Sequence, residues 1–334
     1  MAQRKRRRRR KFRKEFLILV WSVAALLILI PLIVHFAKSG KDKPAENPVS
    51  QTESLPVSGG SSASQPESST VSEESASAPE SSDADTAGPA VPEDYVDPVT
   101  QLAAQQLEDG RKAIASITEK VSQMQTEAEF SIEAVDGLPY LVAVNRAANC
   151  VTVYTADENG QYTQPYLAMV CSTGGDGTPL GVWKLPTQEE STRYGVRDLW
   201  HLMDGNVYGQ YTTRITPKDG ILFHSVPYFT NGDKGSLEYE EFNKLGETAS
   251  LGCVRLAAVD SKWVFDNCPY GTTVVIYDDA ENPGPLGKPE TIKIDVNNEE
   301  LRGWDPTDPD KDNPWGDTYK SGTAVYAVGA EKLT

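Results

Sequence analysis

The sequence predicts a mostly-β fold with a small helical element, confined to residues 138–279. Short runs of β-branched and aromatic residues alternate there with Asn, Asp and Gly, which is the pattern of strands joined by turns. About 140 residues is also enough chain to bury a core. The segments on either side have compositions that favour other structures.

The chain begins with a basic block followed by an apolar run. Residues 1–15 are rich in Lys and Arg, and residues 16–36 are apolar with few exceptions. As a helix the run would be about 31 Å long, close to the thickness of a bilayer's hydrocarbon core. Because positive charge stays on the cytoplasmic side, we expect a single-pass transmembrane helix in the cell membrane. The amino terminus would be cytoplasmic and the remainder extracellular.

Two other interpretations of this segment are less favourable. A cleaved signal peptide would have a shorter apolar region, and His35-Phe36-Ala37 is a poor cleavage site, so an uncleaved signal-anchor is preferred. A basic head could also indicate nucleic-acid binding. The adjoining apolar run favours the membrane instead, and the net charge of −16 makes the rest of the chain acidic. No nucleic acid is expected as a partner.

Two segments separate the apolar run from the β region. Residues 38–97 consist mainly of Ser, Glu, Pro, Ala and Gly, a composition that cannot offset chain entropy by burial, so a disordered linker is expected. Residues 98–130 show apolar side chains at three- and four-residue spacing, with Gly110 as a weak point. This pattern predicts a stalk helix, or a helix packed on the following domain.

The β region and the tail can be divided further. A turn is expected at 157–160, where Asp-Glu-Asn-Gly separates two strands. Residues 280–334 form an acidic, Pro- and Gly-rich tail, expected to be poorly ordered, with strand-like alternation only at 291–296. The strands are expected at Leu141–Asn145, Cys150–Thr155, Tyr166–Ser172, Gly181–Leu185, Ile221–His224 and Thr272–Tyr277, and a helix at Val259–Asn267.

Two short motifs carry the chemistry. The stretch Ser250-Leu251-Gly252-Cys253-Val254-Arg255-Leu256 places a thiol between a glycine and an arginine. The stretch Ile221-Leu222-Phe223-His224-Ser225 ends an apolar run in a histidine. A nearby imidazole or cation lowers the pKa of a thiol and makes it a nucleophile. We therefore predict Cys253 as the nucleophile and His224 as its base, with Gly252 allowing close approach of the backbone to a reacting carbonyl.

The order of these residues disfavours other kinds of site. The chain has three histidines, His35, His201 and His224, and all precede Cys253. Papain-like peptidases place the histidine after the cysteine, so they are disfavoured. No two histidines or cysteines lie at ligand spacing, so no metal is expected. His201 is flanked by apolar residues and is interpreted as structural, with a cleft-lining role as the alternative.

Residues 138–279 resemble an L,D-transpeptidase catalytic domain of the YkuD type. The resemblance implies a β-sandwich or barrel-like mixed sheet, and a role in peptidoglycan biosynthesis, cell-wall biogenesis and cell shape without a cofactor. The motifs that carry it are Ser172-Thr173-Gly174, Thr178-Pro179-Leu180-Gly181, Phe223-His224-Ser225, Ser250 to Arg255, and Gly271-Thr272-Thr273-Val274-Val275-Ile276.

The resemblance also implies a division of labour. Cys253 would attack the carbonyl between the third and fourth residues of a donor stem peptide, and His224 would activate the thiol and later deprotonate the acceptor amine. The main-chain carbonyl of Ser225 would orient the imidazole, and N–H groups around Gly252 and Cys253 would hold the oxyanion. The product would be a 3→3 cross-link in peptidoglycan. Carbapenem-type inhibitors are expected to acylate the cysteine.

Four residues are expected to contact substrate or shape its site. Arg255 would support the cysteine loop electrostatically or bind a substrate carboxylate, and the small Ser250 opens that loop. Tyr208 and Tyr211, ahead of the histidine strand, would form cleft walls.

The sequence departs from the family pattern at two places. Leu251 stands where the family often has histidine, and a polar insertion occupies 231–246. The insertion is expected to form a flap beside the cleft and so to affect substrate preference.

Three rival functions stay open. Water as the acceptor would make the protein an L,D-carboxypeptidase. A sortase shares the anchor, the β domain and the His–Cys order, but its arginine usually follows the cysteine at a greater distance than Arg255 follows Cys253. A catalytically idle wall-binding module is disfavoured because both Cys253 and His224 are present.

The other cysteines raise the question of a disulfide. If Cys253 is a free thiol, at most one bond can form among Cys150, Cys171 and Cys268. Mirroring the expected hairpin about residue 160 places Cys150 opposite residue 170, close to Cys171. A cross-strand bond is therefore possible, and three buried thiols are the alternative.

Overall fold

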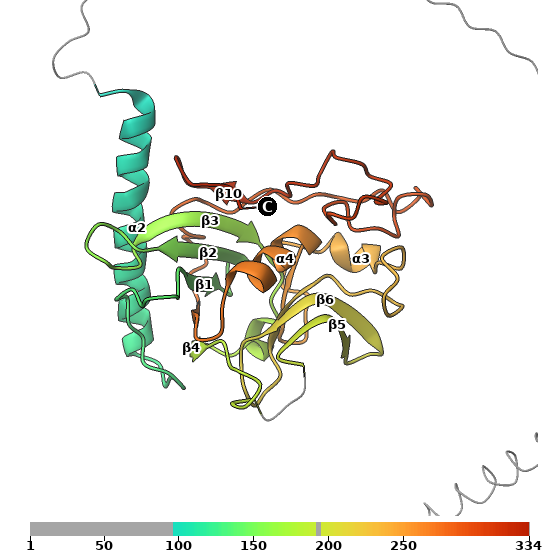
Figure 1. The fold of residues 1–334 in the computed structure, drawn as a ribbon, viewed down its shortest axis with the longest axis horizontal. Helices are drawn as coiled ribbons and strands as arrows, with labels where there is room; N and C mark the ends of the chain where they lie inside the picture. The colour runs from blue at the N-terminus through green and yellow to red at the C-terminus, as the bar shows by residue number, and fades with distance from the viewer. Residues whose placement is uncertain (1–95, 192–194, 334) are drawn as a thin grey trace, which may run out of the picture. The chain divides into compact units, whose positions relative to one another are not determined.

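The computed structural model describes residues 96–191 and 195–333. The basic segment 1–15, the transmembrane helix 16–36 and nearly all of the linker 38–97 lie outside the described residues, so they stay predictions. Within the described ranges, no helix is long and apolar enough to cross a membrane. This part of the chain folds around two β-sheets, which Figure 1 shows.

The first sheet is mixed and has the strand order β10-β3-β2-β1-β9-β4. Strands β1 and β9 run parallel, and the other neighbours are antiparallel. Both faces of the central strands are buried, which explains why they are continuous apolar runs in the sequence. The strands are β1 (Leu141–Asn145), β2 (Cys150–Thr155), β3 (Gln164–Val170), β4 (Gly181–Lys184), β9 (Thr273–Tyr277) and β10 (Val325–Tyr326).

The second sheet has the order β5-β6-β7-β8, with β7 and β8 parallel. Its inner face meets the first sheet in a shared apolar core, to which Val142 and Val151 contribute from one sheet and Phe223 and Val254 from the other. The expectation of a mostly-β, mixed-sheet fold is therefore confirmed. The elements are β5 (Arg197–Met203), β6 (Val207–Arg214), β7 (Leu222–Ser225), β8 (Val254–Leu256), the 3-10 turn η1 (Gly175–Gly177) and the helices α3 (Tyr239–Phe242) and α4 (Ala258–Asn267).

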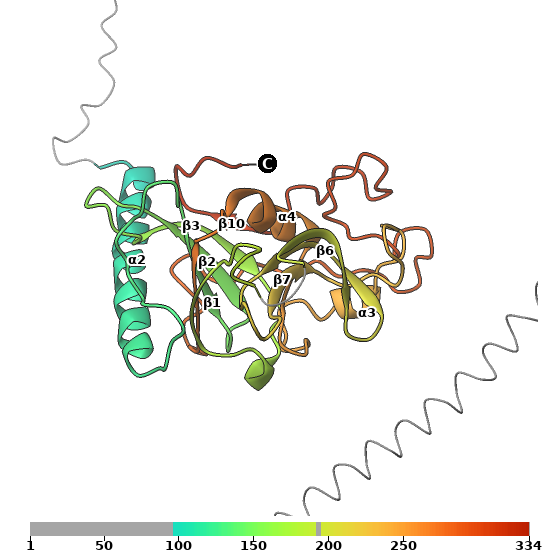
Figure 2. The same cartoon turned by 60° about the horizontal axis from the view of Figure 1, so that its bottom comes forward.

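The first described helix packs on the domain. Helix α2 covers Pro98–Ser122, so it is shorter than the predicted 98–130, and the Asp97 side chain caps its first turn. Ile114, Ile117 and Val121 pack against the outer face of the first sheet. Figures 1 and 2 show the helix beside β1, β2 and β3. Of the two alternatives drawn from the sequence, the packed helix is the one observed.

Gly110 has a packing reason to be a glycine. A Cβ at this position would lie 2.3 Å from the carbonyl oxygen of Thr163 and 2.5 Å from the Pro165 ring. The glycine therefore lets α2 approach β3 closely, and it is a contact point rather than a weak point of the helix.

The expectation that the tail, residues 280–334, is poorly ordered was wrong. Residues 280–333 are largely without regular structure, yet they lie against the domain, and β10 pairs with β3. Asp305, Thr307 and Asp308 are fully buried, and the Asp305 carboxylate accepts a hydrogen bond from the Ala258 N–H at the start of α4. Residues 291–296 are not a strand. Buried polar contacts order this segment, and its composition does not reveal them.

The cysteine register agrees with the mirrored hairpin, but the four cysteines are free. Cys150 pairs directly with Val170. Adjacent residues of a strand point to opposite faces, so Cys171 faces the shared core while Cys150 faces away from it. Of the two alternatives, a disulfide or three buried thiols, the three buried thiols are observed.

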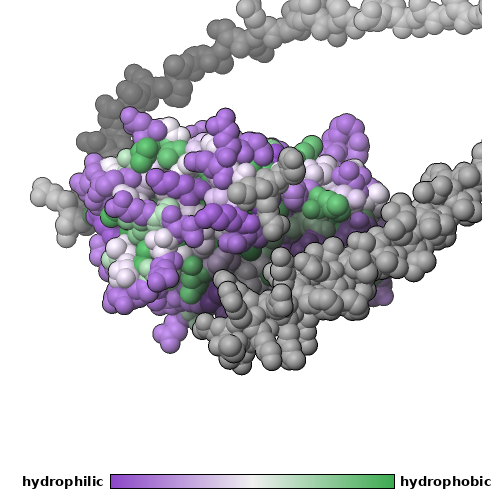
Figure 3. Space-filling view, turned by 90° about the horizontal axis from the view of Figure 1, so that it is seen from below, coloured by the Kyte–Doolittle hydropathy of each residue, from purple (hydrophilic) through white to green (hydrophobic). Residues whose placement is uncertain are grey.

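The face of the molecule in Figure 3 is mainly hydrophilic, with hydrophobic residues in small separate groups. A candidate active site is therefore expected in a cleft of the domain.

Candidate active site

Cys253 and His224 line one cleft of about 250 Å³ beside the second sheet. The parallel register of β7 and β8 pairs Phe223 with Val254 and His224 with Arg255. Cys253 immediately precedes β8, so it lies next to the strand that carries the imidazole. Other lining residues used below are His201, Asp204, Arg214, Asp219, Ser250, Leu251, Gly252 and Arg255.

The Cys253 thiol is half-buried and uncharged in the free protein. Its Sγ lies 3.8 Å from the carbonyl oxygen of Gly220. Burial raises the pKa of the thiol, although the Leu222 backbone and the charges of Arg255 and Arg214 act in the opposite direction. A thiolate must therefore form during the reaction, when a base takes the proton.

The His224 imidazole is buried and fixed in one orientation. Its side chain is 1% exposed, and Nδ1 lies 2.5 Å from the Ser225 carbonyl oxygen. Burial, aided by the nearby charges of Arg255 and His201, lowers the pKa of His224 to about 3, so the ring is neutral at pH 7. A neutral ring that donates through Nδ1 keeps Nε2 as a proton acceptor. Ser225 thus occupies the orienting position expected from the sequence.

The cysteine loop packs backbone to backbone against the turn at η1. A Cβ on Gly174 would lie 2.4 Å from the Gly252 nitrogen, and a Cβ on Gly177 would lie 2.5 Å from the Leu251 oxygen. The Thr178 hydroxyl donates to the Gly252 carbonyl at 2.7 Å and accepts from the Gly174 N–H at 2.7 Å. These contacts explain why glycines and a threonine occupy this turn.

The Ser250 hydroxyl forms hydrogen bonds with the backbone of its own loop. These bonds change which N–H group is expected to bind the oxyanion. Its hydroxyl donates to the Cys253 carbonyl at 2.6 Å and accepts from the Gly252 N–H at 3.1 Å. The Gly252 N–H is therefore engaged, while the Cys253 N–H has no acceptor among the described residues. The amide of Cys253 is the better-placed donor for a developing oxyanion. Ser250 lines the cleft, and its hydroxyl acts on the loop backbone.

Arg255 supports the loop electrostatically, which was one of the two roles expected for it. Its Nη1 lies 2.6 Å from Glu241 Oε2 and 3.2 Å from the Ala249 carbonyl oxygen. Glu241 belongs to α3, within the insertion 231–246. That insertion is not a flap, because Leu237, Phe242 and Leu245 are buried in an apolar cluster, and none of its residues lines the cleft.

The prediction that Tyr208 and Tyr211 form walls of the cleft was wrong. Neither Tyr208 nor Tyr211 is among the residues that line the cleft. Tyr211 is buried, and its ring meets Phe265 of α4 edge-on. Tyr208 pairs through its backbone with Tyr228. The sequence predicted neither strand β6, which carries both residues, nor the direction of their side chains.

Sequence reasoning missed several residues of the cleft. Arg214 is buried at the end of β6, and Asp204 and Asp219 lie on the exposed turns that flank β6. His201 also lines the cleft, so the alternative kept open for it is the one observed. The signal that could have identified these residues is their charge and their position at strand ends near a catalytic motif.

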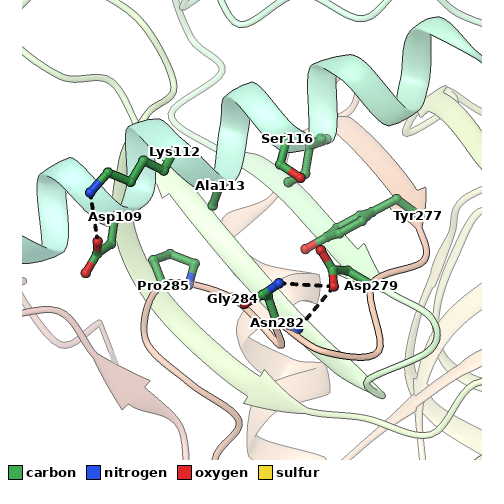
Figure 4. A pocket seen from close by; sticks show the side chains of 10 residues that line it. Asp109, Lys112, Ala113, Ser116, Tyr277, Asp279, Asn282, Gly284 and Pro285 are labelled. Atoms are coloured by element: carbon green, nitrogen blue, oxygen red, sulfur yellow. Dashed lines mark hydrogen bonds and ion pairs between the residues drawn. The ribbon is translucent and has the colours of Figure 1, made fainter.

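A second hollow of about 420 Å³ lies between α2 and residues 277–285 (Figure 4). Asp109, Lys112, Asp279 and Asn282 line it, and no cysteine or histidine does. Over the described residues, no group of three or more His, Cys, Asp or Glu side chains is placed to hold a metal ion. The cysteine cleft is therefore the candidate active site.

The fold and the cleft together define a mixed β domain with a thiol and a neutral imidazole on adjacent strands. Residues 139–276 match the family model of YkuD, the L,D-transpeptidase catalytic domain.

Individual known proteins share parts of the chain. YciB of Bacillus subtilis (strain 168), whose name assigns it to the L,D-transpeptidases, is 34% identical over 119 residues, which are 35% of this chain and 56% of YciB. The chain thus spans little more than half the length of this relative.

Solved structures give weaker similarities. An L,D-transpeptidase from Mycobacterium smegmatis is 18% identical, with a TM-score of 0.31 over 42% of this chain and 59% of that one. L,D-transpeptidase 3 from Mycobacterium tuberculosis, solved with a faropenem-derived adduct, is 18% identical, with a TM-score of 0.30 over 42% and 61%.

Proposed function

We propose that this protein is a peptidoglycan L,D-transpeptidase that forms 3→3 cross-links through an acyl-enzyme on Cys253. The observation that carries the proposal is the neutral His224 imidazole. Its Nδ1 is held by the Ser225 carbonyl, and it shares a cleft with the thiol, in a YkuD domain. The donor would be a tetrapeptide stem.

The first half-reaction transfers the stem to the enzyme. Nε2 of His224 takes the Cys253 proton as sulfur attacks the carbonyl between the third and fourth stem residues. The Cys253 N–H stabilises the oxyanion. The carbon–nitrogen bond then breaks, the proton passes from His224 to the leaving amine, and the terminal D-residue departs. A thioester on Cys253 is left.

The arginines near the pair favour one half of this transfer and oppose the other. At rest both partners are neutral, because burial raises the pKa of Cys253 and lowers that of His224. Arg255 and Arg214 stabilise negative charge on sulfur. Arg255 also opposes positive charge on His224, and its ion pair with Glu241 weakens both effects.

The chemistry suits an extracellular location. Exchange of one amide for another conserves bond energy and needs no ATP. We propose that residues 16–36 anchor the protein in the cell membrane with the amino terminus in the cytoplasm, and that residues 38–97 let the catalytic domain reach the cell wall. Protease protection of the termini in intact cells tests this topology, and cytoplasmic exposure of the carboxyl terminus would contradict it.

Acylation by a carbapenem tests the nucleophile. The intact mass of the full-length protein should rise by one drug molecule, and Cys253→Ala should show no increase. Cys268→Ala is the matched control, because burial raises the pKa of the Cys268 thiol to about 12 and the residue lies in the core. An adduct that persists in Cys253→Ala would refute the assignment, as would no adduct on the folded wild type.

The acceptor decides between the two enzymatic outcomes. An amine of a second stem gives a cross-link, whereas water gives an L,D-carboxypeptidase. Incubation with tetrapeptide stems should yield 3→3 dimers by mass spectrometry. Tripeptides without dimers would favour the carboxypeptidase, and no turnover of stems would favour the sortase or the idle wall-binding module.

A further inference from the structure

The cleft holds a second imidazole that the proposed mechanism does not use. His201 of β5 lines it together with Cys253 and His224. Its Nδ1 lies 2.7 Å from Asp198 Oδ2, which fixes the ring and leaves Nε2 as the acceptor when the ring is neutral. The His201 side chain is 23% exposed, in contrast with the buried His224.

Both histidines lie next to Gly209 of β6. His201 lies directly opposite Gly209 across β5 and β6. A Cβ on Gly209 would lie 3.1 Å from His224 Nδ1. A single glycine therefore separates the two histidine-bearing positions, and the charge of His201 acts on His224.

The opening of the cleft carries negative charge. Asp204, on the turn after β5, and Asp219, on the turn after β6, are exposed and line the opening. The positive groups, Arg214 and Arg255, lie at the end of β6 and on β8. An incoming ammonium group is attracted toward these carboxylates, and Asp204 lies on the turn that follows the strand of His201.

The acceptor of the second half-reaction needs a base. A lysine-like amine is protonated at pH 7, and an ammonium has no lone pair for attack. His224 passes one amine proton to the departing sulfur, so the proton that an ammonium carries in addition needs another acceptor. The cysteine loop adds no acceptor beside the thiol, since Leu251 is 83% exposed and apolar.

We propose that His201, held by Asp198, is the base that deprotonates the acceptor amine, an inference that rests on the proposed transpeptidase function. Nε2 of His201 takes one proton from the ammonium and releases it to solvent. The free amine attacks the thioester carbonyl, a carbon–nitrogen bond forms and the carbon–sulfur bond breaks. The second amine proton passes through His224 to the departing sulfur, which restores the Cys253 thiol.

The test separates the two half-reactions in the full-length protein. The first-turnover release of the donor's terminal residue reports acylation, and dimer formation from a stem amine reports aminolysis. His201→Gln should lower aminolysis about 100-fold and lower acylation far less, so that acyl-enzyme accumulates. Leu199→Gln, an exposed position on the same strand that does not line the cleft, is the control and should change neither rate.

An acceptor that needs no base gives the decisive comparison. Hydroxylamine is largely unprotonated at neutral pH, so it should discharge the acyl-enzyme of His201→Gln at close to the wild-type rate. Asp198→Asn should show the same pattern more weakly. Equal losses with both amines, or equal losses of acylation and aminolysis, would overturn the assignment. Failure of the wild type to form any acyl-enzyme would instead refute the proposed function.

Discussion

The Thr178 hydroxyl joins the turn at η1 to the cysteine loop by donating to the Gly252 carbonyl at 2.7 Å, one residue before the thiol. The same oxygen accepts the Gly174 N–H. One buried side chain thus fixes two loops that come from distant parts of the chain, and the position of Cys253 depends on it.

Replacing Thr178 with valine should impair acylation while the fold persists. Both backbone partners would lose a buried hydrogen bond, which costs about 1–3 kcal/mol for each group. We expect the rate of carbapenem acylation to fall at least about tenfold in Thr178→Val. Thr178→Ser keeps the hydroxyl and should retain most of the rate. Equal rates in the valine and serine variants would show that the loop holds its position without this contact.

The ion pair between Arg255 and Glu241 should affect the pKa of the Cys253 thiol. Arg255 lowers the pKa of Cys253, so Arg255→Gln should raise it, and Glu241→Gln should lower it by leaving the arginine unbalanced. The pH dependence of Cys253 alkylation by iodoacetamide measures both shifts. Shifts of the same sign in the two variants would contradict this electrostatic account.

The tail should contribute to stability through Asp305. Its carboxylate caps α4, whose own Ala257 offers no side-chain cap. Asp305→Ala should cost about 1–2 kcal/mol in the free energy of unfolding, the usual range for a lost N-cap. Asp317→Ala is the control, because Asp317 is exposed and pairs only with Lys320 on the surface, and it should change stability little. Denaturant titration distinguishes them.

Asp260 should make the protein less stable as the pH rises. Burial, reinforced by Asp305, raises its pKa to about 7 from the usual value of 3.8. Between these values the unfolded state is ionised and the folded state holds the proton, so stability falls from pH 4 to pH 7. Asp260→Asn should remove this loss, which is about 4 kcal/mol. Its advantage over the wild type should grow from pH 4 to pH 7 and then level off, and a constant difference would contradict the assignment.

The sequence predicted those parts of the fold that have a strong local pattern. The Val-rich strands β1, β2 and β9 are buried on both faces and read as apolar runs, and the motif around Cys253 identified the nucleophile's loop. Strands β5 and β6 were missed because they include polar residues such as Gln210, Thr212 and Arg214, which are nevertheless buried.

Other features depend on contacts between distant segments. The ordering of the tail rests on Asp305 reaching α4, and the insertion carries Glu241 to Arg255. Neither contact has a local signature. His201 was kept as a cleft-lining alternative, but the sequence does not reveal that Gly209, opposite His201 on β6, packs against His224.

One measurement tests the central claim most directly. The full-length protein is mixed with a tetrapeptide stem, quenched in acid within the first turnover and examined by intact and peptide mass spectrometry. The account predicts a tripeptide acyl group on the peptide that contains Cys253, formed together with one equivalent of the terminal D-residue. Release of that residue with no acyl group on Cys253, or at an undiminished rate in Cys253→Ala, would contradict it.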